Sequence, residues 1–145
     1  MASQEDLDKA YISMASTWSS LSRATRKKVG CLIVKDGTII SDGYNGTPHG
    51  FDNECEYNPN PTVFHKLVTK AEVLHAESNA ITKLAKSTQS SKGSTMYITI
   101  SPCVECAKLI IQSGISRVVY GQLYKNHDGL NLLRQAKITT TELNL

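Results

Sequence analysis

Residues 95–121 read TMYITISPCVECAKLIIQSGISRVVYG and contain the clearest structural pattern in the chain. Two β-rich apolar runs flank a segment whose apolar residues recur at helical spacing. Ser101 is a favourable N-cap, and Pro102 suits the first helical position because its missing N–H costs nothing there. Gly114 is typical of the residue just past a helix end. The stretch therefore predicts a strand, a helix and a second strand, a unit that favours parallel pairing through a right-handed crossover.

Elements of both kinds are predicted on either side of this unit, beginning with a helix that Ser3 and Asp6 open as a capping box. The expected elements are a helix up to about residue 22, a hairpin over residues 29–43, a helix over 62–86, a short helix over 130–136 and a strand over 138–141. A hairpin is antiparallel, whereas the strand-helix-strand units are parallel. The sequence thus predicts one α/β domain, residues 1–145, with a mixed five-stranded sheet and helices on both faces.

The composition of the 145-residue chain is that of a single globular domain, with 40% hydrophobic and 20% charged residues. No apolar stretch approaches the roughly 18 residues of a membrane span, and the acidic, polar start is not a signal peptide. We therefore expect a cytoplasmic protein with no membrane partner. The net charge of +3 is mild, so nucleic acid is not required as a partner.

Two segments outside the regular elements stand out. A turn-rich run over residues 43–61 is long for a loop in a compact domain, and such loops are more often functional than idle. The second is a basic cluster, which forms either a solvated face or an anion site: Arg23, Arg26, Lys27 and Lys28.

The cysteine pair of the quoted stretch could pack, form a bridge, act in redox chemistry or hold a metal. Disulfides are disfavoured because nothing in the chain points to secretion. His75 offers a third ligand, since it opens a predicted helix in the way that Cys103 and Cys106 do. Structural zinc normally takes four protein ligands, whereas catalytic zinc keeps one position for water. Three converging ligands therefore predict one catalytic Zn²⁺ per chain.

Glu77 lies two residues beyond His75 and is expected near the metal without binding it. There it could take a proton from zinc-bound water and pass it on, as a general base that becomes a general acid. The combination H-x-E, later followed by P-C-x-x-C, is the signature of zinc-dependent nucleobase deaminases. This chain carries it as HAE at residues 75–77 and PCVEC at residues 102–106.

At this point the chain closely resembles the deoxycytidylate (dCMP) deaminases of the compact bacterial and phage type. The resemblance rests on these stretches: VGCLIVKDG, SDGYNGTP, LHAESNAI, GSTMYITISPCVECAKLIIQSGI and RVVY. It implies a three-layer α/β/α cytidine-deaminase-like fold. Adenosine deaminases acting on transfer RNA usually carry Glu-Pro-Cys where Ser101 begins the motif here, and free cytidine deaminases commonly carry CAE in place of HAE. Both remain alternatives, as does an inactive zinc-stabilised scaffold.

The resemblance implies that zinc hydroxide attacks carbon 4 of cytosine, that Glu77 protonates ring nitrogen 3, and that ammonia leaves to give dUMP for dTMP synthesis. Backbone groups of Ala76 and Ser101 would hold the base edge. Asn45 would bond the sugar hydroxyl, with a simple turn role as its alternative. Candidates for the 5′-phosphate complete the expected substrate-binding set: Asn79, Tyr124 and Arg26.

The resemblance also implies regulation and assembly. Members are typically homohexamers that dCTP with Mg²⁺ activates and dTTP inhibits. The expected effector residues are Gly43, Tyr44, Asn45, Gly46, Arg23 and Lys27. Some phage relatives hold a second, structural zinc, for which Cys55 with His49 or His65 would be the remnant. We expect no second metal, because residues 24 and 73 are alanine and valine where those relatives carry ligands.

Overall fold

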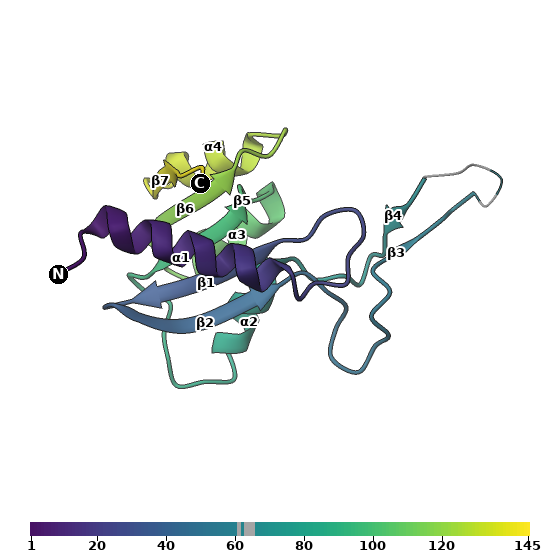
Figure 1. Cartoon of the computed structure of the whole chain (residues 1–145), viewed down its shortest axis with the longest axis horizontal. Coiled ribbons are helices and arrows are strands. Elements are labelled where there is room, and N and C mark those ends of the chain that lie inside the picture. Colours follow the sequence, from purple (N-terminus) through teal and green to yellow (C-terminus); the bar gives the residue numbers. More distant parts are fainter. Residues whose placement is uncertain (61, 63–65) are drawn as a thin grey trace.

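The computed structural model describes residues 1–60, 62 and 66–145, and its elements follow a mixed α/β order (Figure 1). The helices are α1 (Gln4–Ser19), α2 (Ala76–Leu84), α3 (Val104–Gln112) and α4 (Asp128–Gln135). The strands are β1 (Gly30–Lys35), β2 (Thr38–Tyr44), β3 (Glu56–Tyr57), β4 (Val68–Thr69), β5 (Thr95–Ile100), β6 (Arg117–Gln122) and β7 (Thr139–Glu142). None of the described helices combines the length and apolar character that a membrane crossing needs.

Five strands form the main sheet in the order β2-β1-β5-β6-β7. β1 pairs antiparallel with both β2 and β5, whereas β5, β6 and β7 run parallel. This confirms the predicted mixed five-stranded sheet. The parallel half places the C-terminal ends of β5 and β6 at one edge, the edge where α3 begins and the chain leaves β6.

Alternate residues of the central strands face opposite sides of the sheet, and each side is covered by helices. On one side α1 packs through a small cluster: Ile12, Ala15, Leu32, Val34, Tyr97 and Val119. On the other side the larger cluster joins the strands to α2, α3 and α4, and includes Ile33, Ala80, Ile98, Ile110, Val118 and Leu133. The molecule therefore has the predicted three layers, visible in Figure 1 as α1 on one face and the other helices behind.

A buried carboxylate fixes α1 to the sheet. Asp8 is 5% exposed and accepts hydrogen bonds from the Tyr97 hydroxyl (2.6 Å) and the two terminal nitrogens of Arg117 (3.0 and 2.7 Å). Burial raises the pKa of Asp8, but the hydrogen bonds from Arg117 and Tyr97 outweigh it and lower the pKa below its ordinary value. The capping box predicted at Ser3 is confirmed at the N-terminus of α1.

Three predicted helix limits are wrong. The first helix ends at Ser19 rather than near residue 22. The helix expected over residues 62–86 begins only at Ala76, because residues 68–69 form β4 and Leu74 pairs with Gly46; the part of that prediction at residues 61 and 63–65 lies outside the described chain. The helix after β5 begins at Val104, because the Ser101 hydroxyl oxygen accepts the Tyr124 N–H (2.7 Å) instead of capping it.

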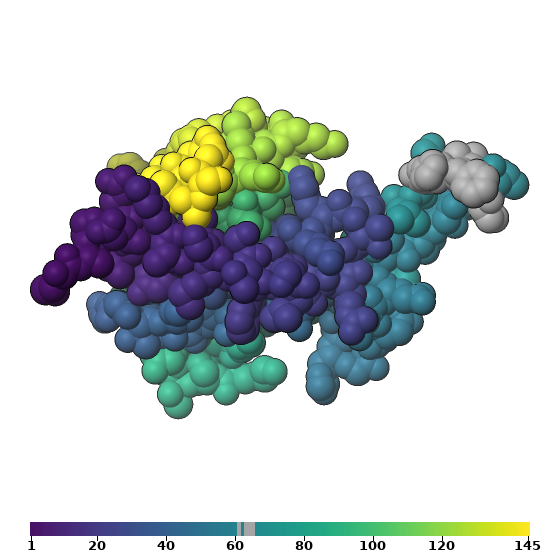
Figure 2. All heavy atoms as spheres, viewed as in Figure 1, coloured from purple at the N-terminus to yellow at the C-terminus, as the bar shows by residue number. Residues whose placement is uncertain are grey.

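The turn-rich segment contains β3, which pairs with β4 in a small antiparallel sheet. We call β3 and β4 together the arm. Glu56 pairs with Thr69, and Tyr57 pairs with Val68. Figure 1 shows the arm extending away from the five-stranded sheet, and Figure 2 shows it protruding from the body of the molecule beside the loop that joins α1 to β1.

Candidate active site

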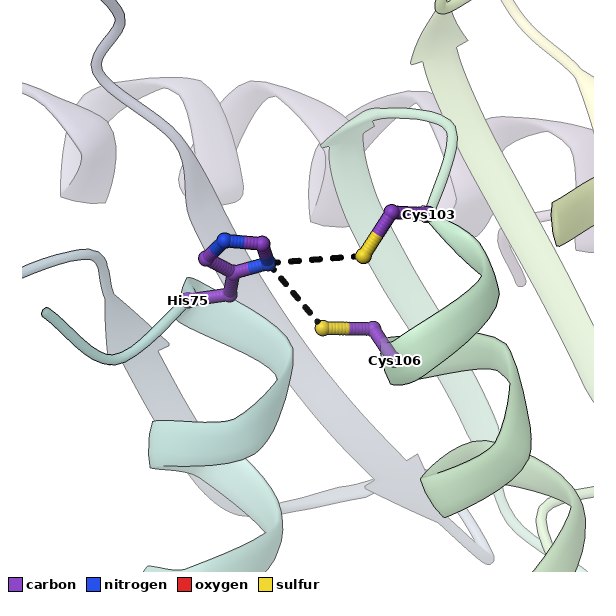
Figure 3. Close-up of side chains that lie close together, drawn as sticks. All are labelled: His75, Cys103 and Cys106. Atoms are coloured by element: carbon purple, nitrogen blue, oxygen red, sulfur yellow. Dashed lines mark hydrogen bonds between the residues drawn. The ribbon is translucent and has the colours of Figure 1, made fainter. Parts of the chain in front are cut away.

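Two helix N-termini bring the three predicted metal ligands together. His75 is the N-cap of α2, Cys103 is the N-cap of α3, and Cys106 lies in the first turn of α3. The Nδ1 atom of His75 lies 3.3 Å from the sulfur of Cys106 and 3.6 Å from the sulfur of Cys103. Figure 3 shows the imidazole facing both sulfur atoms across the space between the two helices. The predicted convergence of these side chains is therefore present.

Close backbone packing holds each helix start in place. Leu74 exchanges two backbone hydrogen bonds with Gly46 (3.0 and 2.8 Å), which fixes the chain just before His75. Beneath α2, a Cβ atom on Gly43 would lie 2.5 Å from the Ala76 oxygen, so only glycine permits this approach of β2. Beneath α3, α4 comes even closer through Gly129, where a Cβ atom would lie 2.0 Å from the Pro102 oxygen. The ligands thus sit on helices whose positions the neighbouring elements determine.

The donor set fits Zn²⁺. Tetrahedral zinc binds thiolate sulfur at about 2.3 Å and imidazole nitrogen at about 2.0–2.1 Å, so bound sulfur and nitrogen atoms lie about 3.6 Å apart. The observed separations of 3.3 and 3.6 Å match that edge length. Among the described residues, His75, Cys103 and Cys106 are the one group of three such ligands within reach of each other. A ligand set of three leaves one position of a tetrahedron for a non-protein ligand.

The electrostatics of the sulfur pair favour a cation. Hydrogen bonds from Cys106 and then His75 lower the pKa of Cys103 to about 3, which makes this sulfur a thiolate at neutral pH. The same hydrogen bond to Cys103, together with burial, raises the pKa of Cys106 far above its usual value. Hydrogen bonding to Cys103 also raises the pKa of His75 despite the opposing effect of burial. A thiolate at Cys103 therefore lies beside the His75 imidazole between the two helix starts.

Glu77 lies in the first turn of α2, next to these ligands, and is 4% exposed. Burial is the main reason that its pKa is raised to about 7, with hydrogen bonds at the helix start and the charge of His75 acting in the opposite direction. A carboxyl group with this pKa can both accept and donate a proton near neutral pH. Its position matches the role predicted for a proton shuttle.

A cleft of about 570 Å³ opens beside the ligands, and His75, Glu77 and Cys103 form part of its wall. Six residues that the sequence analysis singled out for substrate or effector binding also line it: Arg26, Lys27, Asn45, Ala76, Ser101 and Tyr124. The cleft therefore joins the metal ligands to residues from four other segments of the chain.

The Asn45 side chain organises the backbone at one end of the cleft. Its carbonyl oxygen accepts the Val29 N–H (2.9 Å), and its amide donates to the Lys27 carbonyl oxygen (2.7 Å). One amide hydrogen remains for a ligand. Across the cleft, the Lys27 ammonium lies 5.7 Å from the centre of the Tyr124 ring, within the range of a cation–π interaction.

Other predicted residues lie outside the cleft lining. The amide of Asn79 donates to the Tyr44 carbonyl oxygen (2.8 Å), which ties α2 to the end of β2. Gly43 packs against α2 as described above, while Gly46, Tyr44 and Arg23 lie beyond the cleft wall. Their predicted roles in phosphate or effector binding stay predictions.

Among the cleft residues that the sequence analysis missed, three carry charged or hydroxyl side chains. Lys125 follows Tyr124 directly, and its position after a parallel strand was a usable signal, because ligands bind at the C-terminal ends of such strands. Glu56 and Thr69 belong to strands of two residues each, which carry no recognisable pattern.

The remnant considered for a second metal does not form a ligand group within the described chain. Cys55 is buried, at 2% exposed, and belongs to no cluster of three ligands there. His49 is likewise outside any such cluster. His65 lies outside the described residues.

A mixed sheet between helix layers, with a His-Cys-Cys ligand set and a buried carboxyl group in one cleft, is the arrangement of zinc-dependent nucleobase deaminases. Residues 5–122 match the family described as "Cytidine and deoxycytidylate deaminase zinc-binding region". The protein belongs to this cytidine and deoxycytidylate deaminase family.

Individual relatives agree with this assignment. The chain is 36% identical to the deoxycytidylate deaminase of Enterobacteria phage T4, in an alignment covering 83% of this chain and 81% of that protein. The human deoxycytidylate deaminase is 38% identical over 76% of this chain and 61% of that protein. Among solved structures, the dCMP deaminase of cyanophage S-TIM5 in complex with dCMP and dUMP is 38% identical and superposes with a TM-score of 0.88, covering 99% of this chain and all of that one.

Proposed function

We propose that the protein hydrolyses dCMP to dUMP and ammonia. The observation that carries this proposal is the placement of a buried Glu77 beside three converging metal ligands, two of which, His75 and Cys103, line the same cleft as Glu77. Relatives from phages and from human that carry the name deoxycytidylate deaminase, and the cyanophage structure with dCMP and dUMP, support this choice of substrate.

In the proposed reaction, a carbon–oxygen bond forms at carbon 4 of cytosine and the bond to the amino nitrogen breaks. When bound by His75, Cys103 and Cys106, Zn²⁺ would act as a Lewis acid that lowers the pKa of water from about 15.7 toward about 7. Glu77 accepts one proton from the attacking water and delivers it to ring nitrogen 3, where it stays in the product. It then accepts the second proton, from the new hydroxyl on carbon 4, and delivers it to the amino group, which leaves as ammonia. Water and dCMP thus give dUMP and ammonia with no other reactant.

Substrate contacts follow from the cleft. Backbone groups of Ala76 and Ser101 would hold the base edge, and the remaining amide hydrogen of Asn45 would reach the sugar hydroxyl. The 5′-phosphate would lie at the end lined by the Arg26 guanidinium and Tyr124, with Asn79 acting on that end from outside the lining. The phosphate of a nucleoside monophosphate would supply a negatively charged partner for the Arg26 guanidinium.

An ultraviolet assay of purified protein against dCMP, cytidine and dCTP tests the proposal. We expect dCMP to be consumed with the highest kcat/KM and with release of ammonia. Preference for cytidine in this assay, or activity only on transfer RNA adenosine in a parallel assay with that substrate, would replace the substrate while keeping the chemistry. A Glu77→Ala variant separates enzyme from scaffold, because an enzyme keeps zinc but stops releasing ammonia.

We further propose activation by dCTP with Mg²⁺ and inhibition by dTTP, in a homohexamer. The support is the family resemblance together with the exposed side chains of Arg23 and of Tyr44. Tyr44 belongs to the GYNG segment, whose other residues are Gly43, Asn45 and Gly46. Lys27, in the same basic cluster, would help to neutralise a triphosphate. Sigmoidal dCMP saturation that dCTP makes hyperbolic is the expected result, and hyperbolic kinetics insensitive to dTTP would remove this proposal.

The reaction would supply dUMP for dTMP synthesis. A cytoplasmic setting fits that role and the reduced state that the metal-binding thiols need. Residues 1–145 would then act as one deaminase domain.

A further inference from the structure

We propose that Glu56 of the arm is a positioning residue that gives the cleft its selectivity for a 5′-phosphate, by holding the loop that carries Arg26 and Lys27. This inference rests on the proposed dCMP deamination and assigns a role to the turn-rich segment, which the chemistry of the zinc site leaves unused. Glu56 itself need not touch the substrate.

The loop between α1 and β1 has no regular structure, so its shape depends on side-chain contacts from elsewhere. The Glu56 carboxylate accepts the Thr25 N–H (2.9 and 3.1 Å to its two oxygens) and the Arg26 N–H (2.9 Å). Two successive backbone amides therefore point at one carboxylate. Hydrogen bonds to an ionised acceptor are stronger than those between neutral groups, so Glu56 is a firm anchor for this part of the loop.

The arm contacts the loop at a second point. Thr69 is paired directly with Glu56 across the two strands, and residues paired in this way project on the same face. The Thr69 hydroxyl oxygen accepts a hydrogen bond from the Arg26 guanidinium at 3.2 Å. One face of the arm therefore holds both parts of Arg26: Glu56 binds its backbone N–H, and Thr69 binds its guanidinium.

The opposite end of the same loop is fixed by Asn45, which bonds the Lys27 carbonyl oxygen and the Val29 N–H. Arg26 and Lys27 therefore lie between two anchors, one on the arm and one at the end of β2. The arm holds this loop through the hydrogen bonds of Glu56 and Thr69, and a single substitution at either residue removes its share of them.

The held cations face the cleft with their charges uncompensated. Among the described residues, no carboxylate lies within ion-pair distance of Arg26, Lys27 or Lys125, although all three line the cleft. Glu56 also lines the cleft, but its carboxylate is directed to backbone amides rather than to these side chains. An anionic group entering this end meets three positively charged side chains, which suits the phosphate of a nucleoside monophosphate.

Kinetics of Glu56→Ala and Glu56→Gln against dCMP and deoxycytidine test the role. For Glu56→Ala we expect KM for dCMP to rise about tenfold with a much smaller change in kcat, because a loosened loop binds phosphate less well while Glu77 and the metal ligands stay in place. The ratio of kcat/KM for dCMP to that for deoxycytidine falls by the same factor. Glu56→Gln keeps one acceptor oxygen and falls between the wild type and Glu56→Ala.

Binding of the products gives the same comparison without turnover. Calorimetry should show that Glu56→Ala weakens dUMP binding about tenfold while deoxyuridine binding changes far less. Thr69→Val removes the second contact with little change of shape, and should weaken dUMP binding in the same direction but by a smaller factor. Thermal unfolding and zinc content identify any variant that fails to fold.

Glu54→Ala is the matched control, because it removes the same charge from an exposed position two residues earlier on the same segment. It should leave the ratio of dCMP to deoxycytidine activity at the wild-type value. If folded Glu56→Ala matches the wild type, or binds dUMP more tightly because a competing carboxylate is gone, the positioning role is wrong and the proposed function stands. A wild-type protein that does not deaminate dCMP removes both.

Discussion

Gly129 is predicted to be indispensable for zinc binding although it lies outside the ligand set. A Cβ atom at this position would lie 2.0 Å from the Pro102 oxygen and 2.8 Å from the Cys103 carbonyl carbon. Carbon and oxygen atoms do not approach within about 3.0 Å, so Gly129→Ala must separate α4 from the start of α3 by about 1 Å. That start carries two of the three ligands.

A shift of this size is large on the scale of a metal site, where ligand distances hold to about 0.2 Å. We therefore expect Gly129→Ala to weaken zinc binding at least about tenfold, the lower limit for disturbing the support of a ligand. Overpacking should also lower the free energy of unfolding by about 1–3 kcal/mol. If the start of α3 moves, the sulfur atoms shift and zinc binding weakens. If α4 moves instead, its packing in the core is lost and the free energy of unfolding falls.

The assay is competition for Zn²⁺ with a coloured chelator, with thermal unfolding measured in parallel. Asn131→Ala is the control, because it alters an exposed position on the same helix. It should leave zinc affinity unchanged. Wild-type zinc affinity and stability in Gly129→Ala would refute the claim that α4 fixes the position of Cys103.

The remaining predictions concern the α1 anchor and the phosphate. Asp8→Asn leaves Arg117 partly buried without its charged partner and should lower the free energy of unfolding by about 3 kcal/mol, whereas Glu5→Gln on the exposed face should not. Because the folded-state pKa of Asp8 is lowered, its contribution is present above the unfolded pKa and is lost as pH falls from about 5 through the folded value; urea unfolding should show this slope in the wild type and not in Asp8→Asn. Tyr124→Phe and Asn79→Ala should each raise KM for dCMP in steady-state assays, and unchanged kinetics for both would move the phosphate site elsewhere.

Much of the fold could be predicted from local sequence patterns. The hairpin and the strand-helix-strand unit were predictable because each depends on neighbouring residues: turn glycines, β-branched runs and helix ends. The helix expected over residues 62–86 was too long, because the true helical pattern from Ala76 was continued backwards into residues 62–75, which are rich in apolar side chains. Pairing of Leu74 with Gly46 and of β4 with β3 decides the structure there, and such long-range pairing leaves little trace in composition.

The convergence of His75, Cys103 and Cys106 was predictable for a similar reason, since each motif is a short string at a helix start. The sequence does not reveal which residues far away in the chain hold the site residues in position. Nothing in the sequence around Gly129 indicates that it lies beneath Cys103, and Glu56 accepts the Thr25 N–H only because the arm lies beside the α1–β1 loop in the folded chain. Asn45 was expected at the sugar, and its two backbone bonds show that it also shapes the loop.

The central claim is that three side chains hold one zinc ion whose remaining position is free for water. X-ray absorption at the zinc edge, combined with metal analysis of the purified protein, tests it most directly. The account predicts one zinc per chain, with two sulfur neighbours at about 2.3 Å and two nitrogen or oxygen neighbours at about 2.0–2.1 Å, one of them His75. A shell with three or four sulfur atoms, a fourth protein ligand, or about two zinc ions per chain would contradict it.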